Sequence, residues 1–230
     1  MYPNNAIFTN PWIALRGMES SDVKAVGGTP YNVAVSMGDT ERYFAEDVPN
    51  AKKWVRSLPG GDALDRLRCD LDDAWPGGCS SKKSEEGRAH HVGLGRVMAG
   101  PTQWSEGFVH VDELAPMSPT KGHFSANLYL KLPSEGGHLE LWPLQFESRW
   151  EFYTNAHTLS KLVSIDEDAQ RELRARLPPP IVLEVAPGDL VLLSVQRPHA
   201  VQGWSSSCSR ASLQSFVNFA GDDAALTLEA

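Results

Sequence analysis

The sequence predicts a mainly β protein with flanking helices, folded as a sandwich or a barrel. From Val92 onward, short alternating or apolar runs are separated by Gly and Pro, which is the pattern of an antiparallel β domain. Helical spacing is limited to a few segments, most of them before this point. The length of 230 residues, without an internal repeat or a long linker, suits one large β-rich domain. We therefore expect residues 1–230 to form a single domain, with a mixed helical and strand buttress at 1–91 and a β core at 92–220.

In the buttress, the residue spacing predicts a strand, two helices and a loop. Tyr31–Met37 alternates as a strand does. Ala51–Leu58 and Ala63–Trp75 have helical periodicity, and in the second of these the leucines and Trp75 recur at intervals of three and four. We expect this apolar stripe to pack against the core. Gly77–Gly87 is rich in small and charged residues, which predicts an exposed loop.

Eight short strands are expected in the β core, each an apolar or alternating run bounded by turn residues. They are Gly93–Met98, Gly107–Asp112, Phe124–Leu132, His138–Trp142, Ile181–Val185, Leu190–Ser194, His199–Gln202 and Ser212–Phe219. One highly charged helix, Ile165–Leu177, interrupts them. It ends before three consecutive prolines, which cannot continue a helix.

The composition narrows the classes of partner. The formal net charge of −8 disfavours a phosphate-binding surface, because affinity for nucleic acid depends on clustered Lys and Arg. Cys69, Cys79 and Cys208 cannot all pair with one another and show no CxxC spacing, which indicates a reducing compartment. The sequence shows neither a signal-peptide pattern nor an apolar run approaching the roughly 20 residues that cross a bilayer. We expect a cytoplasmic protein with neither a nucleic-acid nor a membrane partner.

One short motif could bind a metal ion. If Gly107–Asp112 is a strand, His110 and Asp112 project from the same face, because side chains two residues apart share a face. Phe108 would then form a wall beside them. An HxD pair can also be a solvent-facing polar pair, but His199 in a later strand is a credible third ligand. Two His and one carboxylate on one face form the facial triad that binds non-haem Fe(II).

A second pair of residues suits an anionic ligand. Arg210 and Ser212 lie two apart in the last expected strand and therefore share a face. A guanidinium offers a two-pronged set of donors and the hydroxyl adds another. Together they can hold the remote carboxylate of a dicarboxylic acid.

These residues, in their order and spacing, resemble the Fe(II)/2-oxoglutarate-dependent dioxygenase superfamily. The resemblance covers Gly93 to Phe219 and rests on His110–Val111–Asp112, His199 and Arg210–Ala211–Ser212. Residues 127–130 (NLYL) and 136–142 (GGHLELW) are similar to stretches of its prolyl-hydroxylase-like members. The resemblance implies a double-stranded β-helix, the jelly roll shared with cupins, in which the helices of the first half buttress one sheet.

The resemblance also implies roles for individual residues. Fe(II) would be bound by His110, Asp112 and His199. The co-substrate 2-oxoglutarate would be held at its 5-carboxylate by Arg210 and Ser212, and O2 would be the oxidant. Asn127 and Tyr129 either contact 2-oxoglutarate or fill the barrel.

The implied activity is oxidation, most simply hydroxylation, of a C–H bond in a small molecule such as a free amino acid or a specialised metabolite. Desaturation and oxidative cyclisation start from the same chemistry and remain open. Halogenation needs Gly or Ala in place of the carboxylate ligand, so Asp112 argues against it. A cupin-like binding module without catalysis would not need Arg210 and Ser212.

Overall fold

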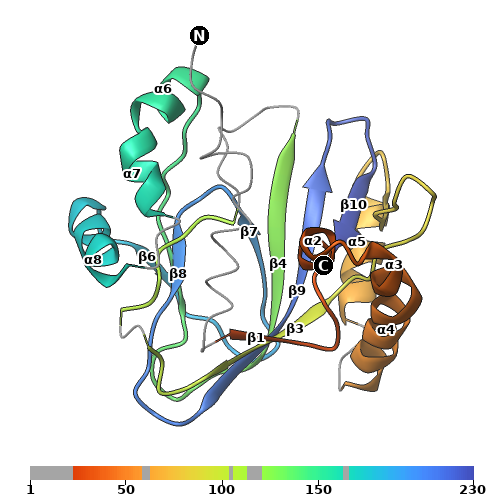
Figure 1. The fold of residues 1–230 in the computed structure, drawn as a ribbon, viewed down its shortest axis with the longest axis horizontal. Coiled ribbons are helices and arrows are strands. Elements are labelled where there is room, and N and C mark those ends of the chain that lie inside the picture. Colours follow the sequence, from red (N-terminus) through yellow and green to blue (C-terminus); the bar gives the residue numbers. More distant parts are fainter. Residues whose placement is uncertain (1–22, 59–62, 104–105, 113–120, 163–165) are drawn as a thin grey trace.

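The computed structural model describes residues 23–58, 63–103, 106–112, 121–162 and 166–230. Within these ranges the chain forms two β-sheets with helices on either side (Figure 1). The predicted class, mainly β with flanking helices, is therefore confirmed. None of the helices in these ranges combines the length and the apolar character that a membrane crossing requires.

The larger sheet is organised around one long strand. Its seven strands are β1 (Val23–Val26), β2 (Cys79–Ser81), β3 (Leu94–Ala99), β4 (Gly122–Lys131), β7 (Leu190–Ser194), β9 (Ser209–Phe219) and β10 (Leu226–Glu229). Strand β9 pairs with β4 along one edge and with β3 and then β10 along the other. Strand β7 extends the sheet beyond β4, and β1 extends it beyond β3. All of these pairings are antiparallel, whereas β10 and β2 run parallel.

The smaller sheet is antiparallel and has the order β6-β5-β8. Its strands are β5 (Leu139–Leu141), β6 (Ile181–Leu183) and β8 (His199–Val201). Beyond β8 it is continued by a single backbone bridge between His110 and His199. Neither sheet closes into a barrel in the described part of the chain.

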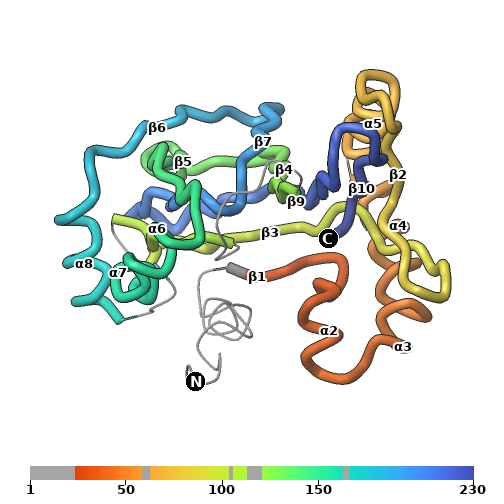
Figure 2. Tube along the Cα trace, turned by 90° about the horizontal axis from the view of Figure 1, so that it is seen from above, coloured from red at the N-terminus to blue at the C-terminus, as the bar shows by residue number. Residues whose placement is uncertain are grey.

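The helices form two groups at opposite sides of the molecule. The first group is α2 (Tyr31–Met37), α3 (Thr40–Arg42), the π-helical turn η1 (Tyr43–Asp47), α4 (Val48–Ser57) and α5 (Ala63–Ala74). The second is α6 (Arg149–Thr154), α7 (Ala156–Lys161) and α8 (Glu167–Arg176). Figure 2 shows the first group beside β2 and β10 of the larger sheet, and the second group beside the smaller sheet.

Each group of helices buries one face of a sheet. The leucine stripe of α5 contacts the larger sheet, where Leu64, Leu128 and Leu213 form a buried cluster together with Trp54 of α4. Helices α6–α8 and Leu162, which follows α7, form a second cluster with the smaller sheet and with the HxD segment, Val109–Asp112. Its members are Val109, Val111, Trp142, Phe152, Leu159, Leu162, Leu173 and Ala200. The expected packing of the apolar stripe of α5 is confirmed.

The prediction of a strand at Tyr31–Met37 is wrong, because these residues form helix α2. Pro30, with a φ of −59°, precedes the first turn, where a proline is tolerated. Gly38 ends the helix in the left-handed conformation, with a φ of 70°, and its N–H bonds to the carbonyl groups of Ala34 and Val35. The helix buries Ala34 against Tyr43 of η1 and Val48 of α4.

Other differences concern elements whose partners lie far away in the sequence. The expected loop at Gly77–Gly87 contains strand β2, which pairs with β10 and buries Cys79. Strands β1 and β10 and helices α6 and α7 were not apparent in the local pattern, although Ser148 caps α6 by accepting a hydrogen bond from the N–H of Glu151. Short elements of this kind depend on tertiary pairing more than on periodicity.

The position of Leu213 in the core predicts a large effect of its truncation. Leu213 is 0% exposed, and Leu213→Ala should lower the free energy of unfolding by about 2–5 kcal/mol, because it removes buried apolar surface and leaves a cavity. The matched control is Leu192→Ala on β7, where the side chain is 51% exposed and the loss should stay within about 0.5 kcal/mol. Urea unfolding measures both, and equal losses would contradict the assigned core.

Candidate metal centre

His110 and Asp112 lie on an irregular segment and not on the continuous strand expected at Gly107–Asp112. Only His110 forms a strand-like bridge, in which its N–H and C=O each bond to His199 at 2.9 Å. The N–H of Asp112 bonds to the carbonyl oxygen of Val195 at 2.9 Å. The alternation is nevertheless kept, because Val109 and Val111 are buried in the core while the two polar residues project together.

The structure brings His110, Asp112 and His199 into one cluster. The Nε2 atom of His110 lies 3.7 Å from Oδ1 of Asp112, and Nε2 of His199 lies 3.8 Å from Oδ2. The three donor atoms all lie within 4.8 Å of one another. Ligands about 2 Å from a single ion are about 3–4 Å apart, so this cluster has nearly the spacing that one metal ion needs.

Both imidazole rings are oriented by backbone carbonyl groups. Nδ1 of His110 lies 3.0 Å from the carbonyl oxygen of Phe108, and Nδ1 of His199 lies 2.9 Å from that of Arg197. A carbonyl can only accept a hydrogen bond, so each Nδ1 carries a proton, and Nε2 of a neutral ring is then the atom that presents a lone pair to the cluster. Metal-binding histidines are typically held in this way.

The cluster also favours the protonation state that a metal requires. Burial, and next the neighbouring His199, lower the pKa of His110 to about 4, although Asp112 acts in the opposite direction. The imidazole of His110 is therefore neutral near pH 7. Since a metal binds the neutral ring, no proton has to be displaced from it there.

Arg210 lies on the larger sheet as a buried cation. Its side chain is on β9, 6% of the residue is exposed, and its Nε donates a hydrogen bond to the carbonyl oxygen of Gly137 at 3.1 Å. The guanidinium also stacks 4.9 Å from the ring centre of Tyr129 and approaches the sulfur of Met98. No carboxylate in the described ranges pairs with it. Burial lowers the pKa of Arg210, and Tyr129 opposes this effect.

Ser212 and Tyr129 lie next to Arg210 on the same face of the larger sheet. Ser212 follows Arg210 by two residues on β9 and is opposite Tyr129 of β4 in the strand register. Both residues are almost fully buried. Burial raises the pKa of Tyr129, while Arg210 acts to lower it. The structure therefore places Tyr129 against the guanidinium of Arg210, with Ser212 beside them on the same face of the sheet.

Asn127 lies on the same face but belongs to a separate polar network. Its amide donates to Oγ of Ser125 at 2.8 Å, and Gln214 donates to the same oxygen at 2.9 Å. Arg96 in turn donates to Oε1 of Gln214 at 2.9 Å. The sequence reasoning missed Arg96, Ser125 and Gln214, although the alternation of Arg210, Ser212 and Gln214 along β9 would have indicated the last of them.

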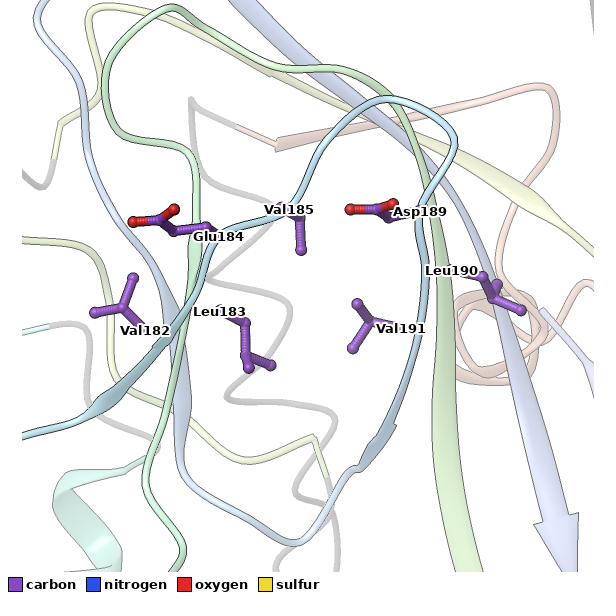
Figure 3. Close-up of a pocket in the computed structure, with 7 residues that line it drawn as sticks. All are labelled: Val182, Leu183, Glu184, Val185, Asp189, Leu190 and Val191. Carbon is purple, nitrogen blue, oxygen red and sulfur yellow. The ribbon is translucent and has the colours of Figure 1, made fainter.

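A cavity of about 550 Å³ opens between β6 and β7, each of which is an edge strand of its sheet (Figure 3). Leu183 and Val191 point into it from opposite sides, while Val182 and Leu190 point away. Its lining is Val182, Leu183, Glu184, Val185, Asp189, Leu190 and Val191. None of the predicted site residues lines this cavity, so the candidate centre is defined by the side-chain clusters and not by it.

The sequence matches no protein-family model and no curated protein. Among solved structures, it is similar to an N-substituted L-amino acid dioxygenase from Burkholderia ambifaria AMMD. The TM-score is 0.54, with 15% sequence identity over 95% of this chain and 90% of that one. The same dioxygenase solved in complex with alpha-KG gives a TM-score of 0.52 at the same identity and coverage. A Pseudomonas putida prolyl-4-hydroxylase is a more distant match. Its TM-score is 0.34, with 14% identity over 92% of this chain and 98% of that one.

The resemblance inferred from the motifs is therefore confirmed at the level of the fold. The chain has the fold of the solved N-substituted L-amino acid dioxygenase over nearly the whole length of both proteins. At 15% identity this likeness concerns the fold.

The cluster predicts a metal site without a redundant ligand. Changing a residue that only supports a metal ligand typically lowers metal affinity about 10–100-fold. Removal of a ligand itself should cost at least as much, so we expect His199→Ala to lower the affinity about 100-fold or more. His157→Ala, which changes an exposed histidine on α7, should leave the affinity unchanged. Titration with Co(II), followed by absorption, measures the affinity, and circular dichroism checks the fold. Wild-type affinity in a folded His199→Ala protein would remove this residue from the site.

Proposed function

We propose that this chain is an Fe(II)- and 2-oxoglutarate-dependent oxygenase that oxidises, most simply by hydroxylation, a C–H bond of a small molecule. In that reaction 2-oxoglutarate, O2 and the substrate give succinate, CO2 and a hydroxylated product, with one oxygen atom entering each of succinate and the product. The observation that carries the proposal is the presence of two complementary sites. One is the cluster of two His and one carboxylate, and the other is a buried arginine without a carboxylate partner in the described ranges.

The path of the chain supports a double-stranded β-helix. Strand β3 belongs to the larger sheet, the HxD segment to the smaller one, β4 to the larger and β5 and β6 to the smaller. The chain then returns to the larger sheet at β7, to the smaller at β8 and to the larger at β9. This alternation between two facing sheets is the winding of a jelly roll. We accordingly assign residues 92–220 as the catalytic core.

The remaining residues support the assignment of a single domain, 1–230. Strands β1 and β2, which lie within residues 1–91, add to the same sheet as β3 and β9. Leu64 of α5 shares a buried cluster with Leu128 and Leu213 of the core. A segment that contributes both strands and core side chains acts as a buttress and not as a separate domain.

In the proposed enzyme, His110, Asp112 and His199 hold Fe(II), and the cluster fits that role by donor type, spacing and ring orientation. When bound, the iron supplies the activation of O2 and of 2-oxoglutarate. The carboxylate of Asp112 offsets part of the charge of the ion. The hydrogen bonds from both Nδ1 atoms hold the rings in the binding orientation.

Arg210 would bind the 5-carboxylate of 2-oxoglutarate. A buried guanidinium without an anionic partner is costly, and a dicarboxylate supplies that partner. Gly137 and the ring of Tyr129 hold the side chain in place, and the hydroxyl group of Ser212 is a further donor on the same face. Asn127, tied to Ser125, would line the pocket beside this anchor.

The substrate class we favour is a free amino acid or a specialised metabolite. A solved protein of the same fold is named an N-substituted L-amino acid dioxygenase, and the net charge of −8 disfavours nucleic acid. Desaturation or oxidative cyclisation would use the same cofactors. A cupin-like binding module without catalysis would not need Arg210 and Ser212 on the face that follows the distal histidine.

The direct test is anaerobic absorption spectroscopy of the protein with Fe(II) and 2-oxoglutarate. The proposed enzyme should show a weak metal-to-ligand charge-transfer band that appears only with both additions. A screen of amino acids and metabolites should then find one that stimulates succinate formation. Absence of the band would overturn the proposed cofactors. A band without stimulated turnover by any compound would favour a binding module.

Arg210 is expected to act on 2-oxoglutarate and not on the metal. Truncating one partner of a desolvated charge pair typically costs about 2–5 kcal/mol, so Arg210→Ala should raise the 2-oxoglutarate requirement about 30-fold or more. Affinity for Co(II) should stay at the wild-type value. Arg56→Ala, on the exposed face of α4, serves as the control. An unchanged requirement in Arg210→Ala would move the anchor elsewhere.

Asp112 is expected to be needed for hydroxylation. Asp112→Gly removes a ligand and opens a position that an anion can occupy, so hydroxylation should collapse. The wild type and the variant are assayed side by side with 2-oxoglutarate, excess chloride and the substrate found in the screen. If the wild type chlorinates, or if the variant hydroxylates at the wild-type rate, Asp112 is not a ligand.

A further inference from the structure

Helix α8 presents one buried polar side chain to the segment that carries the proposed metal ligands. Gln170 is 3% exposed, on a helix whose other buried residue is Leu173. A buried amide is costly unless its donors and acceptor are paired. Its Oε1 accepts a hydrogen bond from the N–H of Val109 at 2.8 Å, and its Nε2 donates to the carbonyl oxygen of Val109 at 3.0 Å. Nε2 also donates to the carbonyl oxygen of Lys161 at 3.3 Å.

The amide of Gln170 takes the place of a neighbouring strand. In an extended segment, the N–H and C=O of successive residues point to opposite sides. The N–H and C=O of His110 point to β8, where they pair with His199. The N–H and C=O of Val109 therefore point to the opposite side, away from β8. Gln170 binds both of these backbone groups. The segment before the HxD motif is therefore held by a strand on one side and by a side-chain amide on the other.

Arg174, one turn further along α8, extends this contact. Its guanidinium donates to the carbonyl oxygens of Gly107 and Glu106 and pairs with Glu140 of β5 at 2.8 Å. Four residues of helix advance about 6 Å, and two residues of strand advance about 6.6 Å. The spacing of Gln170 and Arg174 thus matches that of Val109 and Gly107. The helix is aligned with the segment along two consecutive contacts.

We propose that Gln170 is a positioning residue for the metal centre. The amide of Gln170 fixes the backbone of Val109 and so sets the direction in which the side chain of the adjacent His110 projects. Because side chains alternate along this segment, it also sets the direction of the Asp112 side chain. This inference rests on the proposed function, because it requires that His110 and Asp112 bind the metal. It adds an outer support from helix α8, distinct from the carbonyl groups that orient the imidazole rings.

The test compares Co(II) affinity and protein stability in a small set of variants. Gln170→Met keeps the length of the side chain but removes its hydrogen bonds, and it should weaken Co(II) binding about 10-fold, as loss of an outer support does. Its Co(II) absorption spectrum should also change, because the ligand geometry changes. Arg171→Met, on the exposed face of the same helix, should bind Co(II) as the wild type does.

A destabilised control separates positioning from stability. Leu159→Ala truncates a side chain of α7 that is 1% exposed in the same core cluster, and it should lower the unfolding free energy without changing Co(II) affinity in the folded protein. If Gln170→Met does not fold, Gln170→Asn retains the amide on a side chain one methylene shorter and should show the same loss of affinity. Wild-type affinity and spectrum in a folded Gln170 variant would overturn the inference.

The two proposals fail in different ways. If the wild type binds no Co(II), or if binding survives His199→Ala, the metal centre and its support by Gln170 are both overturned. If the wild type binds Co(II) through His199 and Gln170→Met binds it equally well, only the role of Gln170 is lost. An equal loss of affinity in Leu159→Ala and Gln170→Met would assign the effect to general destabilisation and also overturn that role.

Discussion

The backbone pairing of His110 with His199 is the interaction on which the candidate centre depends. Two hydrogen bonds of 2.9 Å join residues from distant parts of the sequence. Residues paired in this way project their side chains to the same side at close range, and the two ring centres lie 4.3 Å apart. Asp112 joins them through the alternation along its own segment, with its N–H bonded to Val195. The single bridge between His110 and His199 therefore brings three candidate metal ligands together.

The helices determine which sheet faces can be polar. Helices α4 and α5 bury apolar residues of the larger sheet, and α6–α8 do so for the smaller one. The opposite face of β9 carries Arg210, Ser212 and Gln214 instead. Polar groups that leave water need partners, and the half-buried Gln214 has them in Arg96 and Ser125. Arg210 has no carboxylate among the described residues, which is why an anionic ligand is proposed at that position.

The sequence was most informative where an element carries a strong local apolar pattern. Leu190–Ser194 was predicted as a strand with the observed bounds, and the helix at Ala63–Trp75 was predicted to within one residue. Leu190–Ser194 is a short continuous apolar run, and Ala63–Trp75 has its leucines at helical spacing. Tyr31–Met37 was mistaken for a strand because its short run of alternating apolar residues also suits two turns of helix. Strand β2 was missed because its partner, β10, lies at the other end of the sequence.

The sequence by itself determined the types of residue in the candidate site and their local pairing. His110 with Asp112, and Arg210 with Ser212, share a face because each pair is two residues apart. Only the tertiary structure decided that His199 meets the first pair, that Tyr129 stacks on Arg210 and that Gln170 bonds to Val109. These contacts join segments distant in sequence, and a hydrogen bond between distant segments leaves no periodic pattern in either of them. The amide of Gln170 shows this most clearly, since on the sequence it is one polar residue in a charged helix, and in the fold it completes the pairing of the segment that holds the proposed ligands.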